Sequence, residues 1–199
     1  MAIKFQFNKT SLNDLNKQLK MRIRALPTIK SKESALRMEV QKAKEEAGRL
    51  SAELEELINS YIHISGLWNE FEPDLVKVKD VSLSSEKIAG VNIPVLNEVL
   101  FDTGQYSLFG SPVWYTDGIQ ILQTLATAGI RYEFYVQKIN LLDHARKKTT
   151  QKVNLYEKVQ IPGYSEAIRK IKRFLEDEDN LSKSAQKIVK KRQEEEGGE

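Results

Sequence analysis

The sequence contains no cysteine among its 199 residues. Disulfide bonds and thiolate nucleophiles are therefore excluded, and the composition is compatible with a reducing compartment. Aromatic residues make up only 8% of the chain and charged residues 30%. This balance favours long helices over a compact mixed core. No run of about 18 apolar residues occurs, and the first residues lack the apolar segment of a secretory signal. We expect a cytoplasmic protein that does not itself insert into a membrane.

One ladder of apolar residues dominates the first third of the chain. Alternating steps of three and four residues lead from Leu12 to Trp68 without a change of phase, and fifteen of the seventeen positions are apolar. The two polar positions are Arg22 and Glu33. A repeat of 3.5 residues held over this length is typical of a helix wound on a partner helix. The ladder predicts a helix over residues 8–68, and its own span from Leu12 to Trp68 is about 85 Å at 1.5 Å per residue.

A second helical pattern occupies residues 119–192, where apolar residues recur from Ile121 to Ile188. Pro162 interrupts this pattern, as Pro27 interrupts the first. Both patterns continue beyond their prolines. We therefore expect kinked helices rather than broken ones.

An antiparallel arrangement of the two helices has a defined register. If Trp68 faces Gln120 at the turn, the numbers of opposed residues sum to about 188. Pro27 then lies beside Pro162, and our hypothesis is that the two prolines share one bend.

The connecting residues 69–118 carry the signals of extended chain and loops. Residues 75–83 alternate apolar and polar, and residues 91–101 form a second extended piece in which Pro94 suits an edge strand. These pieces predict a β-hairpin, followed by a glycine-rich loop. The whole pattern predicts a mainly α fold, a long antiparallel two-helix coiled coil with a central β-hairpin and loop insert. Residues 193–199 are predicted to form a disordered tail.

The net charge of +3 conceals a segregation along the chain. Residues 1–32 carry +7, residues 33–145 carry −8, residues 146–192 carry +8 and the last seven carry −4. If the helices are antiparallel, the two basic stretches lie together. The cations near the C-terminus fit a solvated helix face, nucleic-acid contact, or contact with the acidic lining of a partner's cavity. The absence of interleaved aromatic residues argues against nucleic acid.

Catalytic and metal-binding motifs are incomplete. Asp102-Thr103-Gly104 matches the Asp-Thr-Gly of aspartic proteases once, but that chemistry needs two carboxylates, and a turn is the simpler interpretation. No Gly-Lys-Ser or Gly-Lys-Thr completes a phosphate loop after Gly110. His63 and His144 have no partners at metal-ligand spacing, whereas a zinc site needs about four ligands. We expect no catalytic residues, no metal and no cofactor.

Four stretches carry a family resemblance in the same order along the chain. They are Asn8-Lys9-Thr10-Ser11 before the leucine ladder, Ile29-Lys30-Ser31-Lys32, Gly90-Val91-Asn92-Ile93-Pro94, and Lys152-Val153-Asn154-Leu155-Tyr156-Glu157 continuing to Ile161-Pro162. Together they resemble the D subunit, the central rotor shaft, of V-type and A-type rotary ATPases. The last stretch is similar to the family's Arg-Val-Asn-Ala-Leu-Glu…Ile-Pro signature. Leu155-Tyr156 in place of Ala-Leu, and the unexpected Pro27, mark a divergent member.

The resemblance implies a non-catalytic shaft that transmits rotation between an ATP-hydrolysing or ATP-synthesising hexamer and the membrane ion-translocating ring. Both termini would insert into the hexamer of catalytic and regulatory subunits. The insert, with Gly90 and Pro94, would lie at the membrane-proximal end. There it would meet the small rotor F subunit and the socket subunit that joins the shaft to the ring. The protein would be peripheral to the membrane through this complex.

The resemblance also implies roles for particular residues. The expected contacts with the hexamer cavity are Lys9, Lys183, Lys187, Lys190, Lys191 and Arg192. The expected shaft positions of the family motifs are Lys30, Lys32, Lys152, Val153, Asn154, Glu157 and Pro162.

A prefoldin-like coiled-coil chaperone is the main alternative, because it also joins two long helices through hairpins. Such a chaperone would expose apolar helix tips to unfolded clients. Here both helix ends are polar and basic, which favours the shaft.

Overall fold

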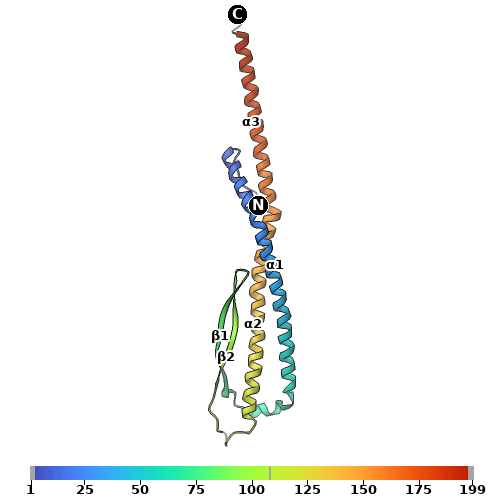
Figure 1. Ribbon diagram of the computed structural model, residues 1–199, viewed down its shortest axis with the longest axis vertical. Coiled ribbons are helices and arrows are strands. Elements are labelled where there is room, and N and C mark those ends of the chain that lie inside the picture. The colour runs from blue at the N-terminus through green and yellow to red at the C-terminus, as the bar shows by residue number, and fades with distance from the viewer. Residues whose placement is uncertain (1–2, 108, 197–199) are drawn as a thin grey trace. The chain divides into compact units, whose positions relative to one another are not determined.

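The computed structural model describes residues 3–107 and 109–196 (Figure 1). Its elements, in chain order, are α1 (Lys9–Ser60), the 3-10 helices Ile62–Glu70 and Pro73–Leu75, β1 (Val76–Ile88), β2 (Val91–Thr103), α2 (Tyr115–Asn154), the π turn Leu155–Gln160 and α3 (Ile161–Glu196). The described chain divides into two units. The middle unit is Lys32–Lys148, and the terminal unit comprises the described residues before and after it. The predicted mainly α fold, with long helices packed together and a hairpin between them, is confirmed.

The ladder found in the sequence is the inward face of α1 and of the segment that follows it. Every ladder position from Leu12 to Trp68 is buried or half-buried, including the polar Arg22. Asn8 caps the helix, since its side-chain oxygen accepts a hydrogen bond of 2.7 Å from the Ser11 N–H. The helix continues through Pro27 as one element.

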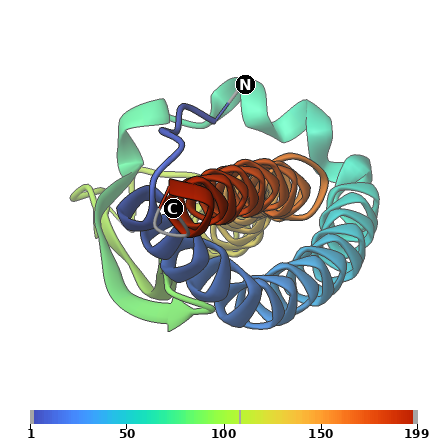
Figure 2. The ribbon, with the colours of Figure 1, turned by 90° about the horizontal axis from the view of Figure 1, so that it is seen from above.

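The first helix is shorter than its sequence pattern predicts. It ends at Ser60 rather than at Trp68, and the 3-10 helix Ile62–Glu70 follows. Branched residues and Gly66 in this stretch weaken the preference for an α-helix. Figure 2 shows the segment crossing from the end of α1 towards the hairpin. Trp68 packs edge-on against Trp114, with ring centroids 5.4 Å apart.

The predicted hairpin is present, and its strands extend beyond the predicted 75–83 and 91–101. β1 and β2 pair antiparallel from Val76 opposite Thr103 to Ile88 opposite Val91, with two irregularities in register. The connecting turn is Ala89-Gly90, with φ values of 47° and 78°. Positive φ at both central residues is the mark of a type I′ turn, whose twist matches that of paired strands.

The core of the middle unit holds the tip of the hairpin against the helices. Ile93 of β2 is fully buried together with Leu36 of α1 and Leu142 of α2, and Val40 and Ala43 complete the cluster. Burying a side chain of this size contributes about 1.5–3 kcal/mol. The hairpin is therefore fastened along the helices.

An aromatic cluster closes the other end of the middle unit. It consists of Phe71, Leu75, Tyr115 and Ile119, with Trp68 and Trp114 packed against it. The Tyr115 hydroxyl donates a hydrogen bond to the Glu70 carbonyl oxygen. The second helix consequently begins at Tyr115, four residues before the predicted start, because the aromatic packing orders what the sequence presents as the end of a loop.

The terminal unit has a separate apolar core. Leu15 of α1 is buried with Ala167, Ile168 and Ile171 of α3, and the leading segment adds Ile3 and Phe5. Each of the two units therefore has a core of its own, which is consistent with the division of the chain.

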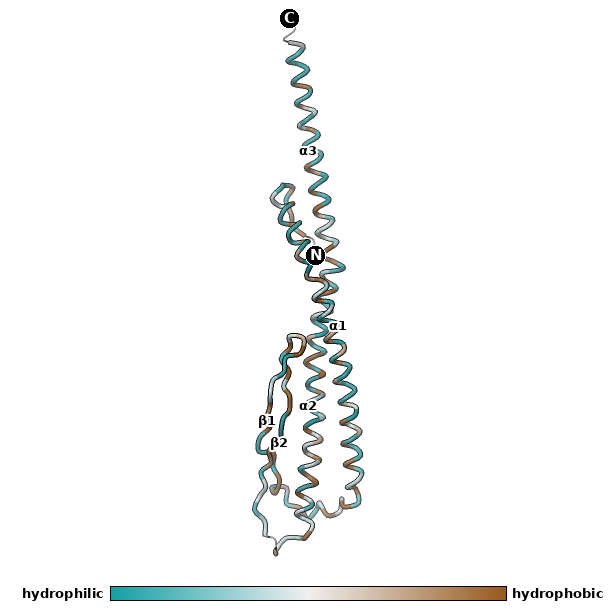
Figure 3. Tube along the Cα trace, viewed as in Figure 1, coloured by the Kyte–Doolittle hydropathy of each residue, from teal (hydrophilic) through white to brown (hydrophobic). Residues whose placement is uncertain are grey.

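The outer part of α3 differs from the expected tail. The helix extends through Glu196, so residues 193–196 are helical rather than disordered. Residues 197–199, the rest of the predicted tail, lie outside the described part of the chain. Figure 3 shows hydrophilic positions dominating the outer part of α3, with isolated hydrophobic ones between them.

The second helical stretch continues beyond Pro162, as the sequence pattern predicts. The π turn Leu155–Gln160 joins α2 to α3, and the Ile161 N–H donates to the carbonyl of Tyr156, five residues earlier.

Candidate partner-binding surfaces

The outer part of α3 exposes a basic and apolar surface, called the C-terminal arm (Leu181–Arg192). It contains five cations and no acidic residue. Leu181 is 73% exposed, Ile188 56% and Val189 53%. The sequence-predicted cavity contacts of the arm are all exposed: Lys183, Lys187, Lys190, Lys191 and Arg192. An exposed apolar stripe flanked by cations suits an apolar cavity with an acidic rim.

Lys9 is the first residue of α1 and is also exposed. It belongs to the terminal unit, as the arm does.

The structure brings two predicted shaft positions together across the terminal unit. Lys30 Nζ lies 2.7 Å from Glu157 Oε1, and each side chain is 47% exposed. Lys152 Nζ lies 5.9 Å from the centre of the Tyr156 ring. Val153 is half-buried in the seam, whereas Asn154, the last residue of α2, is exposed.

The predicted positions Lys32 and Gly90 meet in the middle unit. A Cβ atom added to Gly90 would lie 3.2 Å from Lys32 Nζ, so the turn of the hairpin approaches α1 closely. Pro94 of β2 lies opposite Ser85 of β1, near this turn. Lys32, Gly90 and Pro94 are thus placed at the hairpin tip, beside the Leu36 cluster.

A groove with a cationic rim runs along the middle unit, and sequence reasoning missed it. Its lining, called here the Met38 groove, is Arg37, Met38, Val40, Gln41, Lys42, Lys44, Asp143 and Arg146. Met38 is 61% exposed, although it is apolar. The sequence signal that could have indicated the groove is Met38, an apolar residue that lies outside the ladder and among basic residues.

Electrostatics hold the α2 side of this groove in place. Asp143 accepts a 2.9 Å hydrogen bond from Arg146 Nε, and its oxygens lie 2.9 Å from Lys147 Nζ and 2.8 Å from Arg146 Nη2. These hydrogen bonds, first that of Lys147 and then that of Arg146, hold the pKa of Asp143 below its usual value. Asp143 is therefore ionised at neutral pH and offsets part of the cationic rim.

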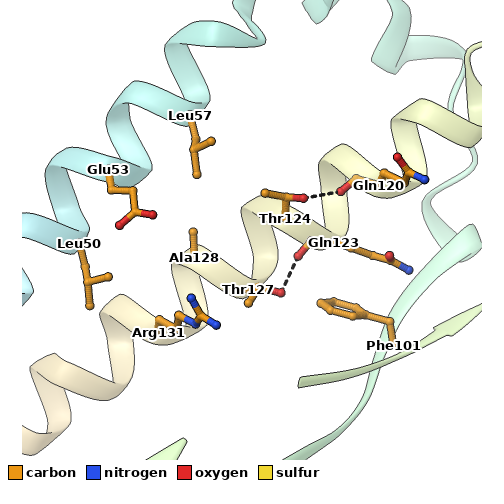
Figure 4. A pocket seen from close by; sticks show the side chains of 10 residues that line it. All are labelled: Leu50, Glu53, Leu57, Phe101, Gln120, Gln123, Thr124, Thr127, Ala128 and Arg131. Atoms are coloured by element: carbon orange, nitrogen blue, oxygen red, sulfur yellow. Dashed lines mark hydrogen bonds between the residues drawn. The ribbon is translucent and has the colours of Figure 1, made fainter. Parts of the chain in front are cut away.

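A second depression lies between α1, β2 and α2 (Figure 4). Its hydroxyl groups are already engaged, since Thr124 donates to the Gln120 carbonyl and Thr127 to the Gln123 carbonyl. Glu53 and Arg131 supply its charged side chains. This lining combines amide, hydroxyl and apolar groups and does not contain the paired acid and base of a catalytic centre.

The loop between β2 and α2 presents two apolar side chains to solvent. Phe109 and Val113 are essentially fully exposed, at 103% and 98%. Sequence reasoning took this segment as a glycine-rich loop and did not single them out. Two fully exposed apolar side chains in one loop make this segment a candidate partner contact.

The residues of the incomplete catalytic and metal-binding motifs lie in separate elements. Asp102 belongs to strand β2, opposite Lys77, and is not in a turn. His63 and His144 are both exposed, one in the 3-10 helix and one in α2. Within residues 3–107 and 109–196 no cluster of three or more acidic or histidine side chains could hold a metal ion. No helix of these residues is long and apolar enough to cross a membrane.

Comparison with known proteins gives one consistent result. A family model for the D subunit of ATP synthase matches residues 11–191. A V-type ATP synthase D subunit from Borreliella burgdorferi is 33% identical over 187 residues, covering 92% of this chain and 93% of the relative. A Chlamydia pneumoniae protein of the same description is 27% identical, with 96% and 94% covered. One from Chlamydia trachomatis serovar L2 is 29% identical, with 96% and 97% covered.

Proposed function

The chain belongs to the family of ATP synthase D subunits, and from this membership we propose how its exposed surfaces are used. It is a non-catalytic central stalk subunit and a member of the V-type ATPase complex, which confirms the resemblance noted in the sequence. This assignment replaces the chaperone alternative. The proposed role is to transmit rotation between the hexamer and the membrane ring.

The C-terminal arm is proposed to enter the cavity of the hexamer. The observation that carries this proposal is the uncovered stripe of Leu181 and Ile188 among five cations and no acid. Apolar side chains would pack against the cavity wall, while the cations would select an acidic lining. Lys9 is assigned to the same contact.

The proposed contact with the socket subunit is made by the loop that carries Phe109 and Val113. An apolar pocket in the socket would cover both side chains, which otherwise remain in water. Gly90 and Pro94 stay predicted contacts of the insert. The packing of the hairpin tip against α1 supports a role in fixing the insert's shape.

The Met38 groove is the proposed seat of the F subunit. Its apolar floor with Arg37, Lys42 and Lys44 at the rim favours an amphipathic helix that carries acidic residues. Met38 supports this use, since an exposed methionine adapts its shape to a partner.

Binding of the full-length chain to the isolated hexamer tests the main proposal. Replacing all five cations of the arm by alanine should weaken binding by at least about tenfold, and raising ionic strength should affect this variant less than the wild type. Lys79→Ala with Lys87→Ala, on exposed positions of the hairpin, is the control and should bind normally. Unchanged affinity of the arm variant would contradict the proposal.

A further inference from the structure

The seam of the second helix shifts by one residue at the π turn. Counting in heptads from the half-buried Tyr156 predicts residues 163, 167 and 170 as the next inward positions, and Gly163 is half-buried and Ala167 buried as this count predicts. Lys170 is instead exposed, whereas Ile171 is fully buried. Tyr156 and Tyr164, whose rings both lie near the Arg22 guanidinium, are eight positions apart rather than seven. The inward position thus moves from 170 to 171 beyond a π turn, whose hydrogen bond spans five residues and so holds one residue more than an α-helical turn.

Pro162 explains why the extra residue is absorbed at this place. In a regular α-helix its ring would meet the carbonyl of residue 158, and no N–H would be available for that carbonyl. The structure has a bond from Ile161 N–H to the Tyr156 carbonyl, five residues back. Pro27 of α1 is accommodated without such a turn, since α1 is described as one α-helix.

Arg22 of α1 contacts this turn, as Lys30 does through Glu157. Its Nε donates a 2.7 Å hydrogen bond to Gln160 Oε1, in the turn. Its guanidinium lies 4.6 Å from the centre of the Tyr164 ring and 5.9 Å from that of Tyr156. One side chain thus lies against two residues of the turn, Tyr156 and Gln160, and against Tyr164 beyond it. This accounts for Arg22, one of the two polar residues of the ladder.

We propose that the π turn and Arg22 form a joint in the stalk. At this joint the backbone hydrogen bonds of the second helix open more readily than those of the helical turns beyond it. Two polar contacts cross the seam here: Arg22 with Gln160, and the half-exposed Lys30 with Glu157. Beyond the turn the seam is the apolar cluster of Leu15 and Ile171. A stalk under torque yields where its helix opens at least cost, and this joint provides that place.

Amide hydrogen exchange of the full-length chain tests the joint directly. The amides of residues 157–161 should exchange at least roughly tenfold faster than those of residues 164–171, the change expected for one net hydrogen bond. Arg22→Lys keeps the charge but loses the planar contact with two rings, and should accelerate exchange at 157–161 further. Arg24→Lys, two residues along on an exposed position, is the control. Equal protection of the two segments would overturn the proposal, and so would identical exchange in Arg22→Lys and wild type.

Deletion of single lysines tests the extra residue independently. Both deletions are made with Pro162→Ala, so that no proline ring opposes a straight helix. Removing Lys158, in the turn, should leave Ile168 and Ile171 in phase and keep Tm within about 2 °C of Pro162→Ala alone. Removing Lys170 displaces Ile171 from the seam and should lower Tm by about 5 °C or more. Equal losses in the two deletions would show that the turn holds no surplus residue.

Discussion

Lys30 and Glu157 lie 127 positions apart in the chain, yet Lys30 Nζ and Glu157 Oε1 are separated by only 2.7 Å. This contact falls within one residue of the antiparallel register predicted from the sequence. Both residues come from stretches that carry the family resemblance. The contact therefore links two family motifs and defines the alignment of α1 with the second helix in the terminal unit. The predicted shared bend at Pro27 and Pro162 stays a prediction.

The first prediction concerns the strength of this ion pair. A double-mutant cycle with Lys30→Ala and Glu157→Ala should give a coupling free energy of about 0.2–1 kcal/mol, because both side chains are half-exposed. Urea unfolding at low and high salt measures it, and about 1 M salt should remove most of the coupling. A coupling above about 2 kcal/mol would contradict a solvent-screened pair.

The second prediction concerns the fastening of the hairpin. Ile93→Ala removes a fully buried side chain at the contact with Leu36 and Leu142, and should cost about 2–5 kcal/mol in the free energy of unfolding. Leu100→Ala on the same strand is the control, since Leu100 is 42% exposed. It should cost less than about 1 kcal/mol. If thermal or urea unfolding gives equal losses, the hairpin tip is not held by this core.

Periodicity was sufficient to predict most of the fold. The ladder specified the inward face of α1 because a heptad repeat encodes packing directly, residue by residue. It overran the helix end because the same spacing also places Ile64 and Trp68 inward in a 3-10 helix. The start of α2 was missed for a different reason. Tyr115 is ordered by Phe71 and the Glu70 carbonyl, contacts that no local pattern reveals.

The candidate surfaces were less predictable from the sequence. The cations of the arm were found because charge is visible in the sequence itself. The Met38 groove needs Arg146 beside α1, about a hundred residues away in the chain, so only the folded register assembles it. The step of eight residues from Tyr156 to Tyr164 could have been read from the seam. Interpreting this step required the structure, which shows that Ile171 is buried and Lys170 is exposed.

The third prediction concerns the turn of the hairpin. Ala89 has φ of 47°, a conformation that costs an alanine energy and suits asparagine. Ala89→Asn should therefore raise the free energy of unfolding by about 0.5–1 kcal/mol. Gly90→Ala, at φ of 78° and close to Lys32, should lower it. Thermal unfolding of both variants gives the comparison, and a loss of stability in Ala89→Asn would be inconsistent with a type I′ turn.

The fourth prediction concerns acid sensitivity. Lys147 and Arg146 lower the pKa of Asp143 in the folded chain. A lowered folded pKa gives stability that is present above the unfolded value, near 3.9, and is lost as pH falls through the folded pKa. Asp143→Asn should therefore be less stable than wild type at pH 7. The difference should shrink as pH falls below about 4. Urea unfolding at pH 7, 5 and 3 measures it, and a difference that does not change with pH would refute the assignment.

The fifth prediction contrasts two glycines of α2. A Cβ on Gly118 would lie 2.7 Å from Trp114 Cζ3 and 3.3 Å from Phe71 Cε2. Neither ring can yield easily, because Trp114 packs against Trp68, Phe71 and Tyr115. Gly118→Ala should therefore cost about 1–3 kcal/mol, as overpacking does.

Gly129 is the matched control, since a Cβ there would meet nothing within 4 Å. Gly129→Ala should gain about 0.5–1 kcal/mol from the better helix propensity of alanine. The two substitutions are chemically identical and lie in one helix, so only their surroundings differ. Opposite signs in urea unfolding would locate the cost in the aromatic cluster. Two gains would mean that the Trp114 ring moves aside, and that the cluster does not determine where α2 begins.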